Sequence, residues 1–180
     1  SKINLRANLP LKNKRKTMNL TKEEYEKMQE FVKFSFDFAR QDDVHSLKIM
    51  LENGLNVNLA NHKGDTLLML ASYHNSIECV KLLLEFGANV DKVNDKGHTP
   101  LAGVCFKGYE EVAKILLENG ANPNGFEGQG GALSPINTAI MFRRKEILSL
   151  LLRYNTQKLH FWQRLFLKFS LIKDKRIQRL

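Results

Sequence analysis

The chain has 180 residues, a net charge of +9 and 43% hydrophobic residues, which suits one globular domain with tails. The positive charge lies at the ends: residues 1–20 carry +6 and residues 159–180 carry +5, so the middle carries 9 − 11 = −2. A near-neutral middle argues against nucleic-acid binding, which needs basic groups on a folded face. No apolar run in the sequence is typical of a secretory signal or a spanning helix, so we expect a cytoplasmic protein.

The two cysteines and the histidines do not form a recognisable chemical site. Cys79 and Cys105 lie in apolar, helix-like stretches, where reduced and buried thiols are the expectation. The five histidines lack the spacing of metal ligands; they are His45, His62, His74, His98 and His160. The sequence shows no nucleophile with a plausible base and no phosphate loop. We therefore expect no catalytic residues, no metal and no cofactor in a protein that is not an enzyme.

The first predicted elements are a basic arm and a helix. Residues 1–20 are predicted to be a disordered, basic arm. Thr21 and Glu24 have the spacing of a capping box, which predicts that a helix begins there. We expect this helix to pack on the structure that follows it.

A repeat of 33 residues organises the next part of the chain. Glycines recur at this interval in two series, and so does a threonine; the positions are Gly54, Gly87 and Gly120, then Gly64 and Gly97, then Thr66 and Thr99. The sequence between them predicts two helices per repeat, joined by a tight turn and followed by a loop. In residues 62–91, "TLLMLASYHN" is the expected first helix and "SIECVKLLLEFG" the second. The final glycine suits a left-handed helix cap.

This pattern resembles the ankyrin repeat. The closest resemblance is in residues 95–124, "DKGHTPLAGVCFKGYEEVAKILLENGANPN", and residues 62–91 form a second copy. Residues 34–58 resemble a capping first repeat and residues 132–155 a fourth, in which Ser134 takes the place of Thr99 after 35 residues. The histidine usual in the motif is replaced by Met69 and Ala102. The resemblance covers about residues 33–156 and implies an all-α ankyrin-repeat solenoid of about four repeats with flanking N- and C-terminal helices. The N-terminal capping helix and the repeats together form the expected domain, residues 21–157.

The resemblance also implies where a partner protein binds. Ankyrin stacks bind through a concave side formed by the first helices and the hairpin tips. The corresponding residues are Arg40, Gln41, Tyr73, His74, Phe106, Lys107, Met141 and Phe142, and His98 belongs to the adjoining polar rim with His62, Lys63, Asp65, Asp95 and Lys96. Aromatic side chains in a row are a typical anchor for a partner. The alternative is that they only pad the groove or contact one another between repeats.

A looser resemblance supplies an alternative function. The chain is similar to small bacterial ankyrin proteins, some of which accompany catalases and are implicated in haem supply to them. Tyr73 and His74 are both able to ligate ferric haem iron, and Phe106 would pack on the porphyrin. The main expectation is nevertheless a monomeric protein-binding module: an adaptor, inhibitor or accessory factor.

The last predicted element is a basic amphipathic helix over residues 158–180. Its apolar residues recur at helical spacing; they are Phe161, Trp162, Leu165, Phe166, Phe169 and Ile172. Three interpretations stay open: the helix caps the fourth repeat, docks on a partner, or lies on an anionic membrane surface.

Overall fold

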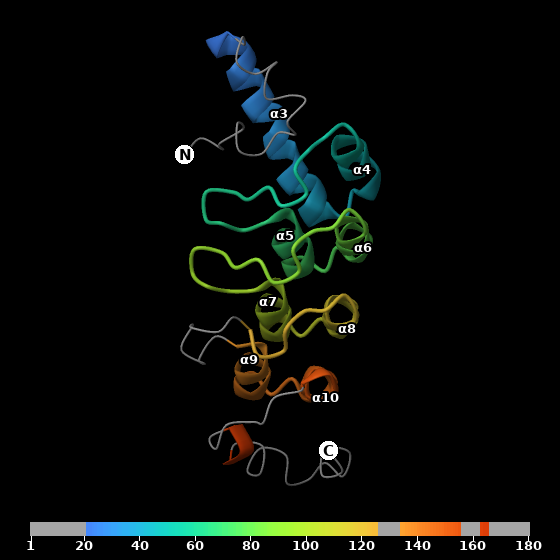
Figure 1. The fold of residues 1–180 in the computed structure, drawn as a ribbon, viewed down its shortest axis with the longest axis vertical. Coiled ribbons are helices and arrows are strands. Elements are labelled where there is room, and N and C mark those ends of the chain that lie inside the picture. The colour runs from blue at the N-terminus through green and yellow to red at the C-terminus, as the bar shows by residue number, and fades with distance from the viewer. Residues whose placement is uncertain (1–20, 126–133, 156–162, 166–180) are drawn as a thin grey trace.

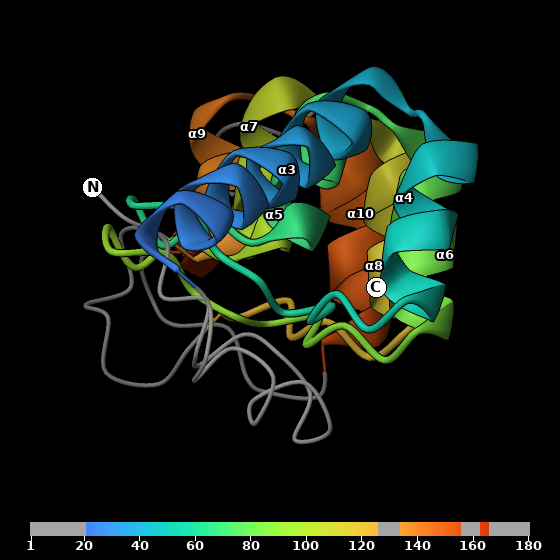
Figure 2. The ribbon, with the colours of Figure 1, turned by 90° about the horizontal axis from the view of Figure 1, so that it is seen from above.

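The protein is a stack of helix pairs (Figure 1). We analysed a computed structural model, which describes residues 21–125, 134–155 and 163–165. The inner column consists of α3, Lys22–Gln41; α5, Leu67–Tyr73; α7, Pro100–Lys107; and α9, Pro135–Met141. The outer column consists of α4, Val44–Glu52; α6, Ile77–Glu85; α8, Glu110–Glu118; and α10, Lys145–Tyr154. Seen from above, the two columns lie side by side, and the connecting loops project from one edge (Figure 2). The predicted all-α solenoid is confirmed.

The N-terminal helix is longer than the sequence suggested. We expected a separate helix packed on the first repeat, but α3 runs without a break from Lys22 into the first repeat and ends at Gln41. No glycine or proline lies in this stretch to end a helix. The predicted capping box is confirmed, since Thr21 Oγ1 accepts from the N–H of Glu24 and the Glu24 carboxylate accepts from the N–H of Thr21. The start of α3 therefore projects beyond the repeats (Figure 1).

Each later inner helix begins at a hydroxyl cap. The side chains of Thr66, Thr99 and Ser134 accept hydrogen bonds from the backbone N–H three residues further on. The motif keeps these caps although Met69 and Ala102 replace the usual histidine. Proline follows the cap in α7 and α9, where its missing N–H is not needed.

One continuous apolar core fills the space between the columns. In α6, α8 and α10, the middle leucine of a run of three apolar residues is completely buried; these residues are Leu83, Leu116 and Leu151. Both cysteines are free and buried, which confirms the expectation. Burial, followed by the nearby Asp42 carboxylate, raises the pKa of Cys79 to about 12, so its thiol stays protonated. Burial alone raises the pKa of Cys105.

Polar groups join neighbouring repeats along the loop edge. The Asn94 amide donates to Asp65 Oδ1 at 2.8 Å, and the Asn58 side-chain oxygen accepts from the N–H of Asn89 at 2.7 Å. The Asp91 carboxylate accepts from the N–H of Asn122 in the same way. The predicted turns also form, and Gly64 and Gly97 have positive φ angles of 74° and 78°. A side chain at residue 64 would collide with the backbone of Asp95, so Gly64 is required by close approach as well as by conformation.

The fourth repeat is described only in part. Most of the glycine-rich segment at residues 125–131 lies outside the described residues, as does nearly all of the predicted C-terminal helix. Residues 163–165 are helical, and Gln163 Nε2 donates to Asn137 Oδ1 of α9 at 2.8 Å. This contact attaches the beginning of the C-terminal segment to the inner helix of the fourth repeat. The basic arm, residues 1–20, also lies outside the described part of the chain.

Candidate functional site

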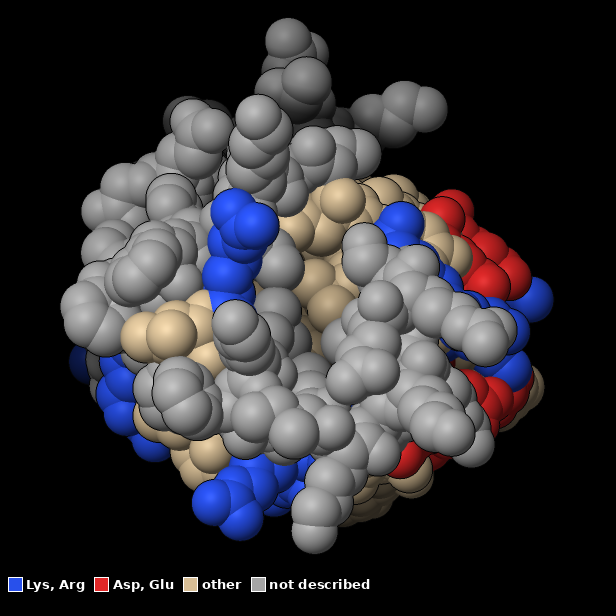
Figure 3. All heavy atoms as spheres, turned by 90° about the horizontal axis from the view of Figure 1, so that it is seen from below, with Lys and Arg blue, Asp and Glu red and all other residues tan. Residues whose placement is uncertain are grey.

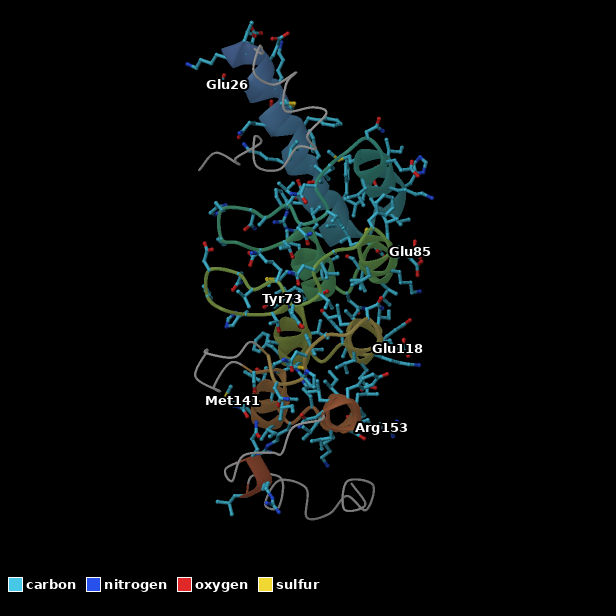
Figure 4. All side chains as sticks on the ribbon, viewed as in Figure 1. Glu26, Tyr73, Glu85, Glu118, Met141 and Arg153 are labelled. Atoms are coloured by element: carbon cyan, nitrogen blue, oxygen red, sulfur yellow. The ribbon has the colours of Figure 1, made fainter. Side chains whose placement is uncertain are left out.

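The predicted binding residues lie together at the C-terminal ends of the inner helices. We call this surface the inner face: Arg40, Gln41, Tyr73, His74, Phe106, Lys107, Met141 and Phe142. Its aromatic side chains are accessible, with exposed fractions of 38% for Tyr73, 41% for Phe106 and 40% for Phe142. Met141 is 62% exposed. Figure 4 shows Tyr73 and Met141 beside the inner column, whereas Glu85, Glu118 and Arg153 lie beside the outer column.

The backbone exposes these side chains because each inner helix ends there. Tyr73 is the last residue of α5, and the chain turns at Asn75, which has a positive φ of 60°. Gly108 after α7 and Arg143 after α9 have positive φ angles of 89° and 54° at the corresponding points. The residues just before each turn cannot enter the core, because the chain is changing direction there. They therefore face outward in every repeat.

Side chains from neighbouring repeats touch across the inner face. The Lys107 ammonium lies 4.5 Å from the centre of the Tyr73 ring, in position for a cation–π interaction. Phe106 and Phe142 meet edge to face, with ring centres 4.7 Å apart and an interplanar angle of 88°. Both contacts join a residue of one repeat to the residue one position beyond its equivalent in the next repeat. The side chains thus contact one another and still present accessible surface.

Positive charge surrounds His74. Partial burial first, and then the charges of Arg40 and Lys107, hold the pKa of the His74 imidazole below its ordinary value. His74 is therefore neutral at pH 7. The Tyr73 and His74 rings lie edge to face with centres 6.1 Å apart. The arrangement offers an uncharged imidazole beside two cations.

The structure does not join every predicted residue to this surface. His98 lies in the hairpin before α7, where its backbone N–H donates to Asn94 Oδ1. No hydrogen bond or ring contact among the described residues links the His98 imidazole to the inner face. Arg40 does belong to it, but its guanidinium is paired with Asp37 at 2.7 Å.

The sequence reasoning missed two exposed aromatic residues and one arginine. Phe31 and Phe34 of α3 are 60% and 50% exposed, and the Phe34 ring stacks on Phe38 with centres 6.4 Å apart. The signal was present, because phenylalanines at positions 31, 34 and 38 form a second apolar stripe beside the buried one. Arg144 donates from Nη2 to the Phe106 carbonyl at 2.8 Å, behind the exposed ring pair. No sequence pattern indicated that contact.

Comparison with known proteins agrees with this architecture. Residues 36–127 match the description "Ankyrin repeats (3 copies)", so the chain belongs to the ankyrin-repeat family. Ankyrin repeats are protein–protein interaction modules and are typically without catalytic activity. A segment of 46 residues is 61% identical to the ankyrin repeat protein PA3287 of Pseudomonas aeruginosa. That segment covers 26% of this chain and 27% of the Pseudomonas protein, so the match spans about a quarter of either one.

The described residues contain neither a candidate membrane span nor a candidate metal cluster. None of the helices in the described ranges is long and apolar enough to cross a membrane. No group of three or more His, Cys, Asp or Glu side chains in the same ranges is arranged to hold a metal ion.

Proposed function

We propose that the chain holds another protein against its inner face and acts as an adaptor, inhibitor or accessory factor. The observation that carries this proposal is the exposure of Tyr73, Phe106 and Phe142 on three consecutive repeats. Aromatic side chains supply much of the binding energy in many protein interfaces. Here they are held in place by contacts with one another and with Lys107, so a partner would meet a preformed surface. A monomer acting in a reducing, cytoplasmic setting accords with the two buried, unpaired thiols.

The experiment compares two triple variants of the full chain. One replaces Tyr73, Phe106 and Phe142 with alanine, and the matched control replaces three exposed apolar residues of the outer side, Ile49, Phe86 and Tyr154. Both remove comparable exposed surface. Each tagged protein is used to capture partners from its native cell, followed by quantitative mass spectrometry, and melting temperatures are measured in parallel.

The inner-face variant should lose the partners that the wild type and the control variant retain, while its melting temperature falls only slightly. Retention of every partner by the inner-face variant would exclude this surface as the binding site. A collapse of its melting temperature would show that the three rings mainly stabilise the fold.

Haem binding is a second proposal, and in that case catalase would be the partner that receives the haem. The lowered pKa of His74 favours it, because a neutral imidazole is the form that ligates iron. Tyr73 and His74 are consecutive residues, so only one of them would supply an axial bond to a given iron.

A further inference from the structure

Charged residues are distributed differently on the two columns of helices. On the outer column, lysines are paired with acids of the same helix: Lys48 with Glu52 at 4.0 Å, Lys81 with Glu78 at 2.7 Å, and Lys114 with Glu118 at 3.8 Å. Acidic side chains outnumber lysines on α6 and α8. Figure 3 shows Asp and Glu atoms gathered on the side where Figure 2 places the outer helices. Three of the four outer helices, α4, α6 and α8, therefore supply counter-charges to their own lysines.

The inner helices of the later repeats have no such counter-charges. The sequences of α5, α7 and α9 contain no Asp or Glu. Lys107, at the end of α7, is exposed and forms no ion pair with any described residue; it lies on the Tyr73 ring instead. Within the described ranges, the only acid paired with a cation of the inner face is Asp37, which holds Arg40 at the first repeat.

Arg40 and Lys107 both act on His74. Both Arg40 and Lys107 disfavour its protonated form, although they come from α3 and α7, on either side of α5. Positive charge from the first and third repeats thus acts on one part of the inner face, around the neutral His74 of the second repeat. Beside it lie the exposed side chains of Phe106, Phe142 and Met141.

We infer that the inner face binds an acidic segment of a partner protein. Carboxylates of this segment bind at Lys107 and Arg40, the cations of the inner face. An apolar or aromatic side chain of the segment packs against Phe106 and Phe142. This inference rests on the proposed function and adds the chemical class of the partner. Stabilisation of the α7 carboxyl end by Lys107 explains one cation at that position. It does not explain why that cation lies on the exposed Tyr73 ring with no acid of the described residues beside it: Lys107 is the one charged residue of α5, α7 and α9, whereas every outer helix carries an acid.

The test uses a fluorescein-labelled synthetic peptide of repeating Glu-Glu-Tyr units and the full chain. Binding is followed by fluorescence anisotropy at low salt, where interface charges act most strongly. The wild type should bind this peptide about tenfold more tightly than the same peptide with Gln in place of Glu. Lys107→Glu should weaken binding of the acidic peptide about tenfold, and Lys107→Arg should keep it within about twofold.

Lys114→Glu is the matched control, because it makes the same change in net charge on the outer column. It should leave the affinity within about twofold. Equal losses for Lys107→Glu and Lys114→Glu would overturn the inference, since the attraction would then come from total charge, including the basic ends. Polyuridylic acid that bound with the same dependence on Lys107 would also overturn it and assign the face to nucleic acid.

The experiments distinguish failure of the proposed function from failure of the acidic-segment inference. If partner capture depends on Phe106 but the acidic peptide shows no dependence on Lys107, the inner face binds proteins of another class. If the peptide depends on Lys107 but partner capture ignores the aromatic residues, the acidic site stands and the proposed function is wrong.

Discussion

Arg144 of the fourth repeat donates a hydrogen bond from Nη2 to the backbone carbonyl of Phe106 in the third repeat, at 2.8 Å. This carbonyl is at the end of α7, where no further turn of helix supplies a donor. The guanidinium also packs against Gly108, where an added Cβ would lie 2.9 Å from Arg144 Cζ. Glycine at residue 108 therefore serves both the left-handed turn and the contact with Arg144. The Phe106 ring and its backbone are held by different residues of the next repeat.

Replacing Arg144 with lysine should reduce the free energy of unfolding by about 1–2 kcal/mol, because the charged hydrogen bond to the Phe106 carbonyl is lost. Urea unfolding followed by circular dichroism measures the change. Arg153→Lys on the exposed side of α10 is the control and should have no measurable effect. A result within error of the wild type for Arg144→Lys would show that this contact does not stabilise the junction.

Ser72→Ala should stabilise the protein by about 1 kcal/mol. The Ser72 side chain is completely buried, and its hydroxyl has no hydrogen-bond partner among the described residues. The equivalent positions in the other repeats, Ala39, Cys105 and Ile140, are apolar and buried. Thermal and urea denaturation would measure the gain. A loss of stability would mean that the hydroxyl has a partner after all.

Asp91→Asn should remove part of the pH dependence of stability. Burial raises the pKa of the Asp91 carboxyl, although its hydrogen bond from Asn122 acts in the opposite direction. A raised pKa in the folded state means that the folded protein holds the proton more tightly, so stability falls as pH rises from the unfolded pKa through the folded one. The Asn variant should lack this fall.

Denaturation series at several acidic pH values would test this, with the exposed Asp95→Asn as control. The control should follow the wild-type curve. An Asp91→Asn curve parallel to the wild type would show that burial of Asp91 has no net effect on its ionisation.

The pKa of His74 should rise when Lys107 is changed to Gln. The positive charge of Lys107 disfavours protonation of His74, and the substitution removes that charge while leaving a side chain of similar length. The imidazole resonances can be followed by NMR titration, with Lys114→Gln as the distant control. An unchanged pKa would show that Lys107 does not lie near His74 in solution.

Hemin titration separates the two proposed functions. If His74 supplies an axial bond, addition of hemin should give a saturable Soret change with near one-to-one stoichiometry, and His74→Ala should alter that spectrum. Tyr73→Phe should alter it if the phenolate is the ligand instead. Basic and aromatic surfaces also take up hemin, so a chain ending near residue 156 tests whether the signal comes from the C-terminal segment. A spectrum indifferent to both substitutions would exclude haem ligation at this site.

Much of the fold was predictable because the residues that recur every 33 positions are ones whose type is required by the local backbone conformation. Gly64 and Gly97 mark left-handed turns, Thr66 and Thr99 mark helix starts, and the leucines mark the core. The continuity of α3 was not predicted, because the boundary of the first repeat was placed by alignment and not by a helix-breaking residue. The register of the repeat placed Tyr73 and Phe106 on the accessible side, but pairing of Lys107 with Tyr73 depends on side-chain conformation. Sequence spacing alone does not determine it.

The bonds that join successive repeats have an evolutionary consequence. The N–H of Asn89 bonds to Asn58 and that of Asn122 to Asp91, and in both cases the partners are 31 residues apart. Asn124 and Asn155 are joined over the same interval. A tandem gene duplication that added one whole unit would recreate the same junction on both of its sides. The number of units can thus change during descent without a new scaffold, while exposed residues outside these junctions, such as Tyr73, Lys107 and Phe142, remain free to diverge.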